Sequence, residues 1–150
     1  MHTAKKLGVK VIAGVRARRL EEARALGVAD VVALDDDSAI AKLPMLDGVA
    51  DTVGGDTAAK LIAKVKSGGR VGYASVLPDG ASNANPLVTI TRVYARPDAS
   101  KVREFADDIR DGKFLLPIGR RLPLRDAGAA HALAQNGGAG KIVLICQDSF

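Results

Sequence analysis

Three arginines, Arg16, Arg18 and Arg19, stand together directly after a short apolar run at residues 9–15. A guanidinium group presents several N–H donors in one plane, which suits bidentate contact with a phosphate. The alternative interpretation makes them the solvated first turn of a helix. Cations are slightly unfavourable there, because the positive end of the helix dipole lies at that end. We therefore favour contact with an anionic, phosphate-bearing ligand.

A second candidate binding element is the turn in which Val53 is followed by Gly54 and Gly55. It comes directly after a predicted strand, and open α/β sheets bind their ligands at the carboxyl ends of the strands. The alternative is a tight turn that needs positive φ before a helix capped by Asp56. Ligand binding and turn formation explain the two glycines about equally well.

Metal ligands and nucleophiles are few. Cys146 is the single cysteine, and the two histidines, His2 and His131, lie towards opposite ends of the chain. This set can build neither a catalytic Cys/His zinc site nor a four-cysteine structural site. We expect Cys146 to be a buried small hydrophobe and His131 to be partly buried or capping. One cysteine also excludes an intramolecular disulfide, which fits a reducing compartment and makes the cytoplasm the expected location.

The composition narrows the class of protein. The 150 residues are 47% hydrophobic and 26% charged, as in one soluble globular domain or parts of two. The net charge is +5, but the basic residues are mixed with acids along the chain. Aromatic residues make up only 3%, so few rings are available to stack on bases. We expect no nucleic-acid partner and, since no apolar run approaches the ~20 residues of a membrane span, no membrane partner.

Strand patterns alternate with helix patterns through residue 94. In the clearest helix, Ala58, Leu61, Ile62 and Val65 follow helical spacing, and the Ser-Gly-Gly sequence at 67–69 is predicted to end it. Such alternation predicts an α/β fold, with a parallel sheet covered by helices on both faces. The predicted strands are residues 9–15, 31–34, 48–53, 70–75 and 87–94.

The pattern changes after Pro97, which predicts a boundary between residues 1–97 and 98–150. A longer helix begins near residue 98 or 100. Residues 114–124 carry two prolines and are typical of an edge strand or an irregular crossing. A helix at about 126–135 and a strand at 141–146 complete the prediction.

Taken in order, these segments resemble a known family. AKKLGVKVIAGV, RRLEEARALGVADVVALD, DTVGG, SGGRVGYAS and AGKIVLI resemble the cofactor-binding half of a medium-chain dehydrogenase/reductase, in its quinone oxidoreductase branch. DTVGG followed by GGRVGYAS is more specific than either motif alone. The resemblance implies a Rossmann-like sheet and NADPH as the cofactor. In complete relatives it implies zinc-independent hydride transfer to a quinone or an enone.

The resemblance also implies cofactor contacts, but no catalytic residue. Arg16 and Arg19 match the family positions that bind the 2′-phosphate of NADP, and Arg18 is adjacent. No acid that would select NAD lies within reach along the sequence before Glu21. Core packing is the expected role of the Tyr73 side chain, and Lys141 also fits a solvent-facing strand start. The other implied contacts are Val53, Gly54, Gly55, Gly72, Tyr73, Ala74, Val93, Tyr94, Ala95 and Lys141.

The chain departs from the family pattern at its start, where the match begins partway through the first Rossmann helix. The catalytic domain, the first strand and the glycine-rich phosphate-binding turn are therefore expected to be missing, and no G-x-G-x-x-G occurs. The family's strand order is 3-2-1-4-5-6, so losing the first strand predicts two unpaired inner edges. Either the sheet closes up, or another segment or chain fills the gap, or the sequence is part of a larger polypeptide.

Two functions follow from this comparison. The first is a truncated cofactor domain of an NADPH-dependent quinone oxidoreductase-like enzyme, assembled as a homo-oligomer or as part of a larger polypeptide. The second is a noncatalytic Rossmann-like interaction module that has lost dinucleotide binding.

Overall fold

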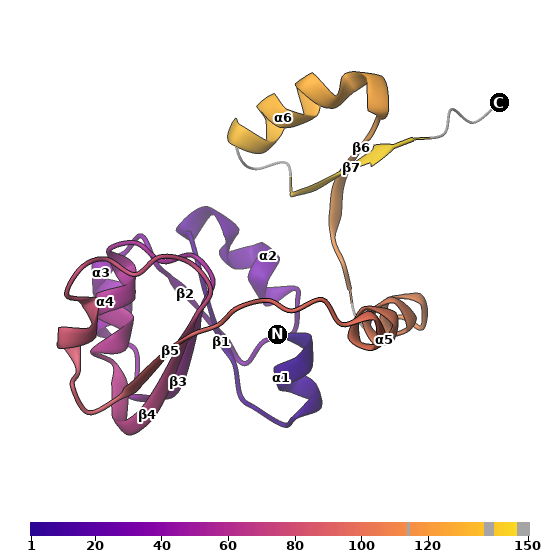
Figure 1. The fold of residues 1–150 in the computed structure, drawn as a ribbon. Helices are drawn as coiled ribbons and strands as arrows, with labels where there is room; N and C mark the ends of the chain where they lie inside the picture. Colours follow the sequence, from indigo (N-terminus) through magenta and orange to yellow (C-terminus); the bar gives the residue numbers. More distant parts are fainter. Residues whose placement is uncertain (114, 137–139, 147–150) are drawn as a thin grey trace. The chain divides into compact units, whose positions relative to one another are not determined.

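The computed structural model describes residues 1–113, 115–136 and 140–146. The chain divides into two compact units, Met1–Asp98 and Ala99–Phe150 (Figure 1). Both units combine parallel strands with helices, which confirms the predicted Rossmann-like α/β class.

The first unit opens with a short helix and then alternates strands with short helices. Every strand pair described in it is parallel, so each strand is joined to the next by a crossover segment. Its elements are α1 (His2–Lys6), β1 (Ile12–Val15), η1 (Ala17–Arg19), α2 (Leu20–Arg24), β2 (Asp30–Ala33), α3 (Asp37–Ala41), β3 (Leu46–Asp51), α4 (Thr57–Ile62), β4 (Val65–Tyr73), η2 (Ala81–Ala84) and β5 (Thr89–Arg92).

The strands of the first unit form two sheets. β1 pairs with β2, and β3, β4 and β5 form a separate sheet with β4 in the centre. Among the described residues, β1 and β3 each have one edge to which no strand is hydrogen-bonded. The predicted unpaired edges are therefore present, and the sheet has not closed across them.

The core of the first unit surrounds β4. Ile62, Val65 and Val71 are each exposed by 1% or less, and Ala81 of η2 joins their cluster. Burying an aliphatic side chain of this size contributes roughly 1.5–3 kcal/mol. This packing fixes β4 between β3 and β5, whose ends carry most of the predicted site. The partly buried residues around the cluster are Val49, Ala59, Leu77, Val88 and Ile90.

The start of β4 differs from the sequence prediction. α4 ends at Ile62, so Val65 and residues 67–69 belong to a nine-residue strand and not to a helix and its stop. The register of β3 against β4 shifts between Leu46 and Gly48, and Gly68 has a φ of +77°. Glycine tolerates such a local irregularity, which lets the strand begin before the regular ladder.

Helix capping also differs from the prediction at one position. Asp56 makes no side-chain capping bond, because its backbone is already helical (φ −60°, ψ −25°) and not extended. Asp36 does cap α3, and its Oδ1 accepts hydrogen bonds from the backbone N–H groups of Ser38 (2.8 Å) and Ala39 (3.2 Å). A side-chain hydrogen bond from Ser38, together with these backbone bonds, lowers the pKa of the Asp36 carboxyl.

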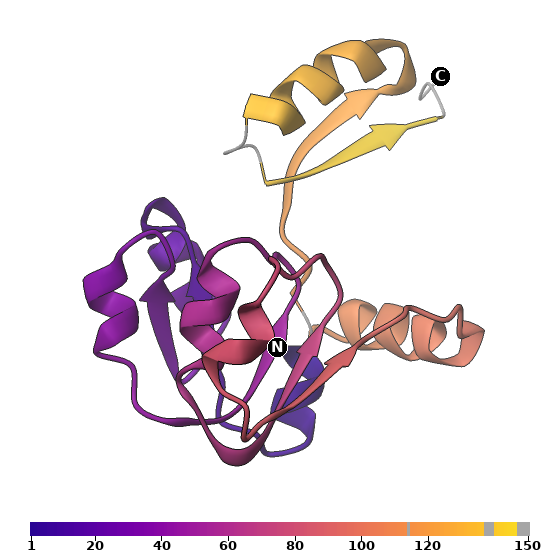
Figure 2. The same cartoon turned by 60° about the vertical axis from the view of Figure 1, so that its left-hand side comes forward.

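The second unit contains a parallel strand pair with a helix alongside it (Figure 2). Cys146 and His131 are exposed, so the expected burial of both is wrong. His131 lies in the middle of α6 and not at a capping position. Cys146 lies just beyond the last residue of β7 and outside the packed strand. The elements of this unit are α5 (Ala99–Arg110), β6 (Ile118–Pro123), η3 (Leu124–Asp126), α6 (Ala127–Asn136) and β7 (Lys141–Ile145).

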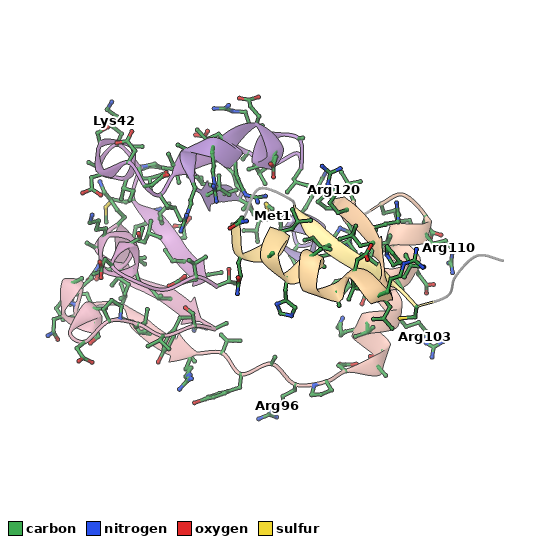
Figure 3. All side chains as sticks on the ribbon, turned by 90° about the horizontal axis from the view of Figure 1, so that it is seen from above. Met1, Lys42, Arg96, Arg103, Arg110 and Arg120 are labelled. Atoms are coloured by element: carbon green, nitrogen blue, oxygen red, sulfur yellow. The ribbon has the colours of Figure 1, made fainter. Side chains whose placement is uncertain are left out.

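Basic side chains are distributed over separate elements of both units. Figure 3 labels Lys42, Arg96, Arg103, Arg110 and Arg120, each of which is exposed. They come from the end of α3, the segment after β5, α5 and β6. The net positive charge therefore does not derive from one basic tract.

Candidate functional site

The carboxyl ends of β3, β4 and β5 lie at the same edge of their sheet. Asp51 of β3 is in register with Tyr73 of β4, which is in register with Arg92 of β5. Backbone hydrogen bonds continue just past the strands, from Ala74 N to the Asp51 carbonyl (2.9 Å) and from Val93 N to the Tyr73 carbonyl (2.7 Å). We call residues 51–55, 72–76 and 92–95 the carboxyl edge. It brings together the predicted site residues at 53–55, 72–74 and 93–95.

The turn after β3 is organised by Asp51. Its Oδ1 accepts hydrogen bonds from the backbone N–H groups of Val53 and Gly54, both at 2.8 Å. Gly54 is buried with a φ of +74°. A Cβ built on it would overlap the Val76 carbonyl oxygen and lie 2.6 Å from the Oγ of Ser75. The packing of this turn therefore already requires Gly54. Gly55, with a φ of +75°, faces open space.

Two buried polar atoms at the carboxyl edge have no hydrogen-bond partner among the described residues: Oδ2 of Asp51 and Oγ of Ser75. Both belong to residues that flank Gly54. A buried polar group without a partner costs roughly 1–3 kcal/mol. A carboxylate oxygen accepts, and a hydroxyl both donates and accepts. Both atoms are closed to solvent, so a ligand hydroxyl reaches them only if the segments packed around Gly54 move apart.

Asp51 and Ser75 are not among the residues predicted from the sequence. The signal that could have found them is positional. Asp51 is the last residue of a strand, and Ser75 lies two residues beyond the end of the adjacent parallel strand. Their proximity follows only from the register of β3 with β4, which a linear pattern does not specify.

Exposed apolar side chains accompany these polar atoms. Val53, Val76, Val93 and Tyr94 are exposed by 77%, 76%, 53% and 69%. The guanidinium of Arg92 lies 4.9 Å from the centre of the Tyr94 ring, within the range of a cation–π contact. Small-molecule sites typically combine an apolar lining with a few polar groups. The carboxyl edge carries both kinds of group, with the apolar side chains exposed and the two oxygens buried.

Gly72 and Tyr73 serve the packing of the edge. A Cβ on Gly72 would lie 3.3 Å from Cγ2 of Val93, so the space over Gly72 belongs to the neighbouring chain segment. Tyr73 is half-buried, whereas Ala74 and Ala95 are exposed.

The three arginines lie at the carboxyl end of β1, and they differ in their exposure and in their ion pairs. Arg16 and Arg18 are exposed, and no ion pair is seen for either within the described residues. Nη1 of Arg19 pairs with Oε2 of Glu22 at 2.8 Å. Oδ1 of Asp35 accepts a hydrogen bond from Ala17 N at 2.7 Å. The expectation that no acid lies within reach before Glu21 is therefore wrong. β2 pairs with β1, which brings Asp35 next to the backbone of Ala17.

Lys141 belongs to the second unit, where it begins β7 and is exposed. In the parts of the chain that the structure describes, no group of three or more His, Cys, Asp and Glu side chains could hold a metal ion. No described helix is long and apolar enough to cross a membrane.

Comparison with known proteins identifies the class. Residues 26–144 match the family model described as zinc-binding dehydrogenase, so the chain belongs to the zinc-binding dehydrogenase family. No curated protein matches the sequence.

Several solved structures share the fold. A quinone oxidoreductase from Coxiella burnetii has a TM-score of 0.83 and 22% identity over 97% of this chain and 48% of its own. A quinone oxidoreductase from Pseudomonas syringae gives 0.73 and 23%, covering 97% of this chain and 51% of its own. A mycobacterial protein complexed with NADPH gives 0.72 and 24%, with the same two coverages. The chain thus spans about half the length of these structures.

The family description names zinc, but the described residues do not fit a zinc ion. Zinc sites use three or four Cys, His or carboxylate ligands held close together, and no such group is found here. We therefore assign no role to zinc in the described part of the chain.

Proposed function

We propose that this chain is the cofactor-binding portion of an NADPH-dependent quinone or enone oxidoreductase. The observation that carries the proposal is the carboxyl edge, where the unpartnered oxygens of Asp51 and Ser75 lie beside exposed apolar side chains. Family membership and the likeness in fold to quinone oxidoreductases support it.

The residues present fit a nicotinamide dinucleotide. The exposed guanidiniums of Arg16 and Arg18 would hold the 2′-phosphate of NADPH. The edge segments 53–55, 72–74 and 93–95 would hold the ribose and nicotinamide end, with Asp51 and Ser75 bonding hydroxyl groups.

When bound, the nicotinamide ring supplies a hydride to the electron-poor acceptor. The residues of this chain bind and orient it, and none acts as a covalent catalyst. Residues 1–97 would form the dinucleotide-binding domain, and residues 98–150 the segment that in relatives returns to the catalytic domain. We infer a cytoplasmic protein that works as a homo-oligomer or within a larger polypeptide.

Residue-resolved NMR titration of the full chain with NADPH tests the proposal. We expect chemical-shift changes concentrated at residues 51–55, 72–76 and 92–95. The affinity should be weak, about millimolar, because the sequence has no glycine-rich phosphate turn. Shift changes that avoid the carboxyl edge, or no changes at all, would overturn the proposal.

A matched pair of variants tests the carrying observation. Ser75→Ala removes one hydrogen bond to the ligand and should weaken NADPH binding about two- to tenfold. Ser82→Ala makes the same change at an exposed position of η2 and should leave the affinity unaltered. Equal affinities for the two variants would exclude Ser75 from the site.

The unpaired edges of β1 and β3 favour a second candidate function, a noncatalytic interaction module. Open strand edges recruit other strands through their free backbone groups. Failure to bind NADPH, combined with concentration-dependent association of the chain, would favour this candidate over the first.

A further inference from the structure

Asp35 introduces a negative charge at the arginine end of β1. It follows β2 by two residues, and its Oδ1 accepts a hydrogen bond from the backbone N–H of Ala17 at 2.7 Å. Ala17 stands in the sequence between Arg16 and Arg18. The carboxylate is therefore fixed beside the backbone that carries both exposed guanidiniums.

The charged groups around Asp35 differ in whether an ion pair already engages them. Arg19 is paired with Glu22, and Arg24 with Glu21. Arg16 and Arg18 have no ion pair within the described residues, and Asp35 is itself exposed. A ligand at this end of β1 therefore meets two available cations and one fixed anion.

The fixed anion acts in opposite directions on two ligand types. A carboxylate at this end of a Rossmann sheet accepts a hydrogen bond from a ribose 2′-hydroxyl, whereas cations bind a 2′-phosphate. The Asp35 carboxylate repels a 2′-phosphate. It also accepts the hydrogen bond of the Ala17 N–H, which is then not available to the phosphate. For an unphosphorylated ribose, the same carboxylate supplies an acceptor.

We propose that Asp35 is a specificity-determining residue that limits the preference for a 2′-phosphorylated ribose, so that this end of the sheet accepts both the NADPH and the NADH type of adenosine. The proposal rests on the proposed function, because it assumes that a dinucleotide binds at the carboxyl ends of these strands. It adds that the arginines alone do not set the choice of cofactor.

The test compares wild type with Asp35→Asn, which keeps an oxygen that can accept from Ala17 N but removes the charge. Asp79→Asn is the matched control, since Asp79 is exposed in a loop of the same unit. The full chain is titrated with AMP and with 2′-phospho-AMP, at moderate salt so that distant charges are screened.

In Asp35→Asn we expect 2′-phospho-AMP to bind about fivefold more tightly and AMP about twofold less tightly. The ratio of the two dissociation constants should therefore shift about tenfold, while Asp79→Asn leaves it unchanged. Structural damage would weaken both ligands, so opposite changes exclude it. An unchanged ratio in Asp35→Asn overturns this inference alone. If wild type binds neither ligand, the proposed function falls and the inference with it.

Discussion

At the scale of single residues, the arginines at the end of β1 are not equivalent. Arg16→Ala and Arg18→Ala together should weaken binding of 2′-phospho-AMP about tenfold to a hundredfold, because hydrogen bonds to a charged group contribute roughly 1.5–3 kcal/mol. Arg19→Ala should have a smaller effect, since Glu22 already holds that guanidinium. Calorimetric titration of both variants measures the difference. Equal losses would show that the Glu22 pair does not engage Arg19 in solution.

Gly54 permits a separate test of the turn after β3. Gly54→Ala places an alanine in a left-handed backbone conformation, and its Cβ would overlap the segment after β4. The substitution should therefore lower the unfolding free energy by about 2–4 kcal/mol. Gly55→Ala has a similar φ but open space, and should cost only about 1–2 kcal/mol. Urea unfolding measures the free-energy loss in each variant, and the difference between the two losses is the cost of the steric overlap at Gly54 beyond the backbone strain that both variants share. The same loss in both would mean that Gly54 does not pack against the segment after β4 as described.

Asp51, Ser75 and Asp35 show why the sequence predicted only part of the candidate site. The sequence identified the segments at the ends of the strands, since apolar runs followed by glycine or arginine are local signals. Asp51 and Ser75 come from different strands, and Asp35 meets Ala17 only because β2 pairs with β1. Contacts of this kind depend on register, which a linear pattern does not specify.

At the scale of elements, β4 provides the clearest stability prediction. Val65→Ala removes two methyl groups from a fully buried position and should lower the unfolding free energy by about 2 kcal/mol. Val76→Ala is the control, because Val76 is 76% exposed and its truncation should stay within about 0.5 kcal/mol. Thermal or urea unfolding gives both values. A small effect at Val65 would contradict its place in the core.

The cap of α3 predicts a dependence on pH. Hydrogen bonds lower the pKa of Asp36 below its ordinary value of 3.8, so its ionised form stabilises the folded chain above that pH. This stabilisation is lost as the pH falls through the lowered pKa. Wild type should therefore exceed Asp36→Ala in unfolding free energy near neutral pH, and the difference should shrink below pH 3.8. A difference that does not change with pH would exclude the charged cap, and Asp79→Ala serves as the control.

The same scale shows how far local patterns determine the elements. The five strands of the first unit were predicted in the correct order, because each is an apolar run bounded by turn residues. The predicted ends were wrong where two patterns coincide. Val65 completes a helical stripe with Ala58, Leu61 and Ile62, yet it equally suits a buried strand. Packing against Val71 decides between them.

At the scale of the whole molecule, the open edges of β1 and β3 should be visible in hydrogen exchange. In β1 the carbonyls of Val11 and Val15 accept hydrogen bonds from the β2 segment, and in β3 the Asp51 carbonyl accepts one from Ala74 N. Successive residues of a strand direct their backbone groups to opposite sides, so Gly14 and Ala50 direct theirs to the open edges. We expect the amides of Gly14 and Ala50 to exchange much faster than those of their strand neighbours. Native-state exchange followed by NMR measures this.

Comparable protection on both sides of these strands would show that another strand covers the open edges, whether from a second copy or from a further segment. Repeating the exchange at several protein concentrations distinguishes the two, because only association between copies depends on concentration.

The pairing scheme also has a consequence for biosynthesis. Every described strand pair joins strands that follow one another along the chain: β1 with β2, β3 with β4, β4 with β5, and β6 with β7. None of the described pairs therefore requires a strand that is synthesised much later in the chain. Each pair can therefore form soon after its second strand leaves the ribosome, and the β1–β2 unit can be assembled while β4 is still being translated.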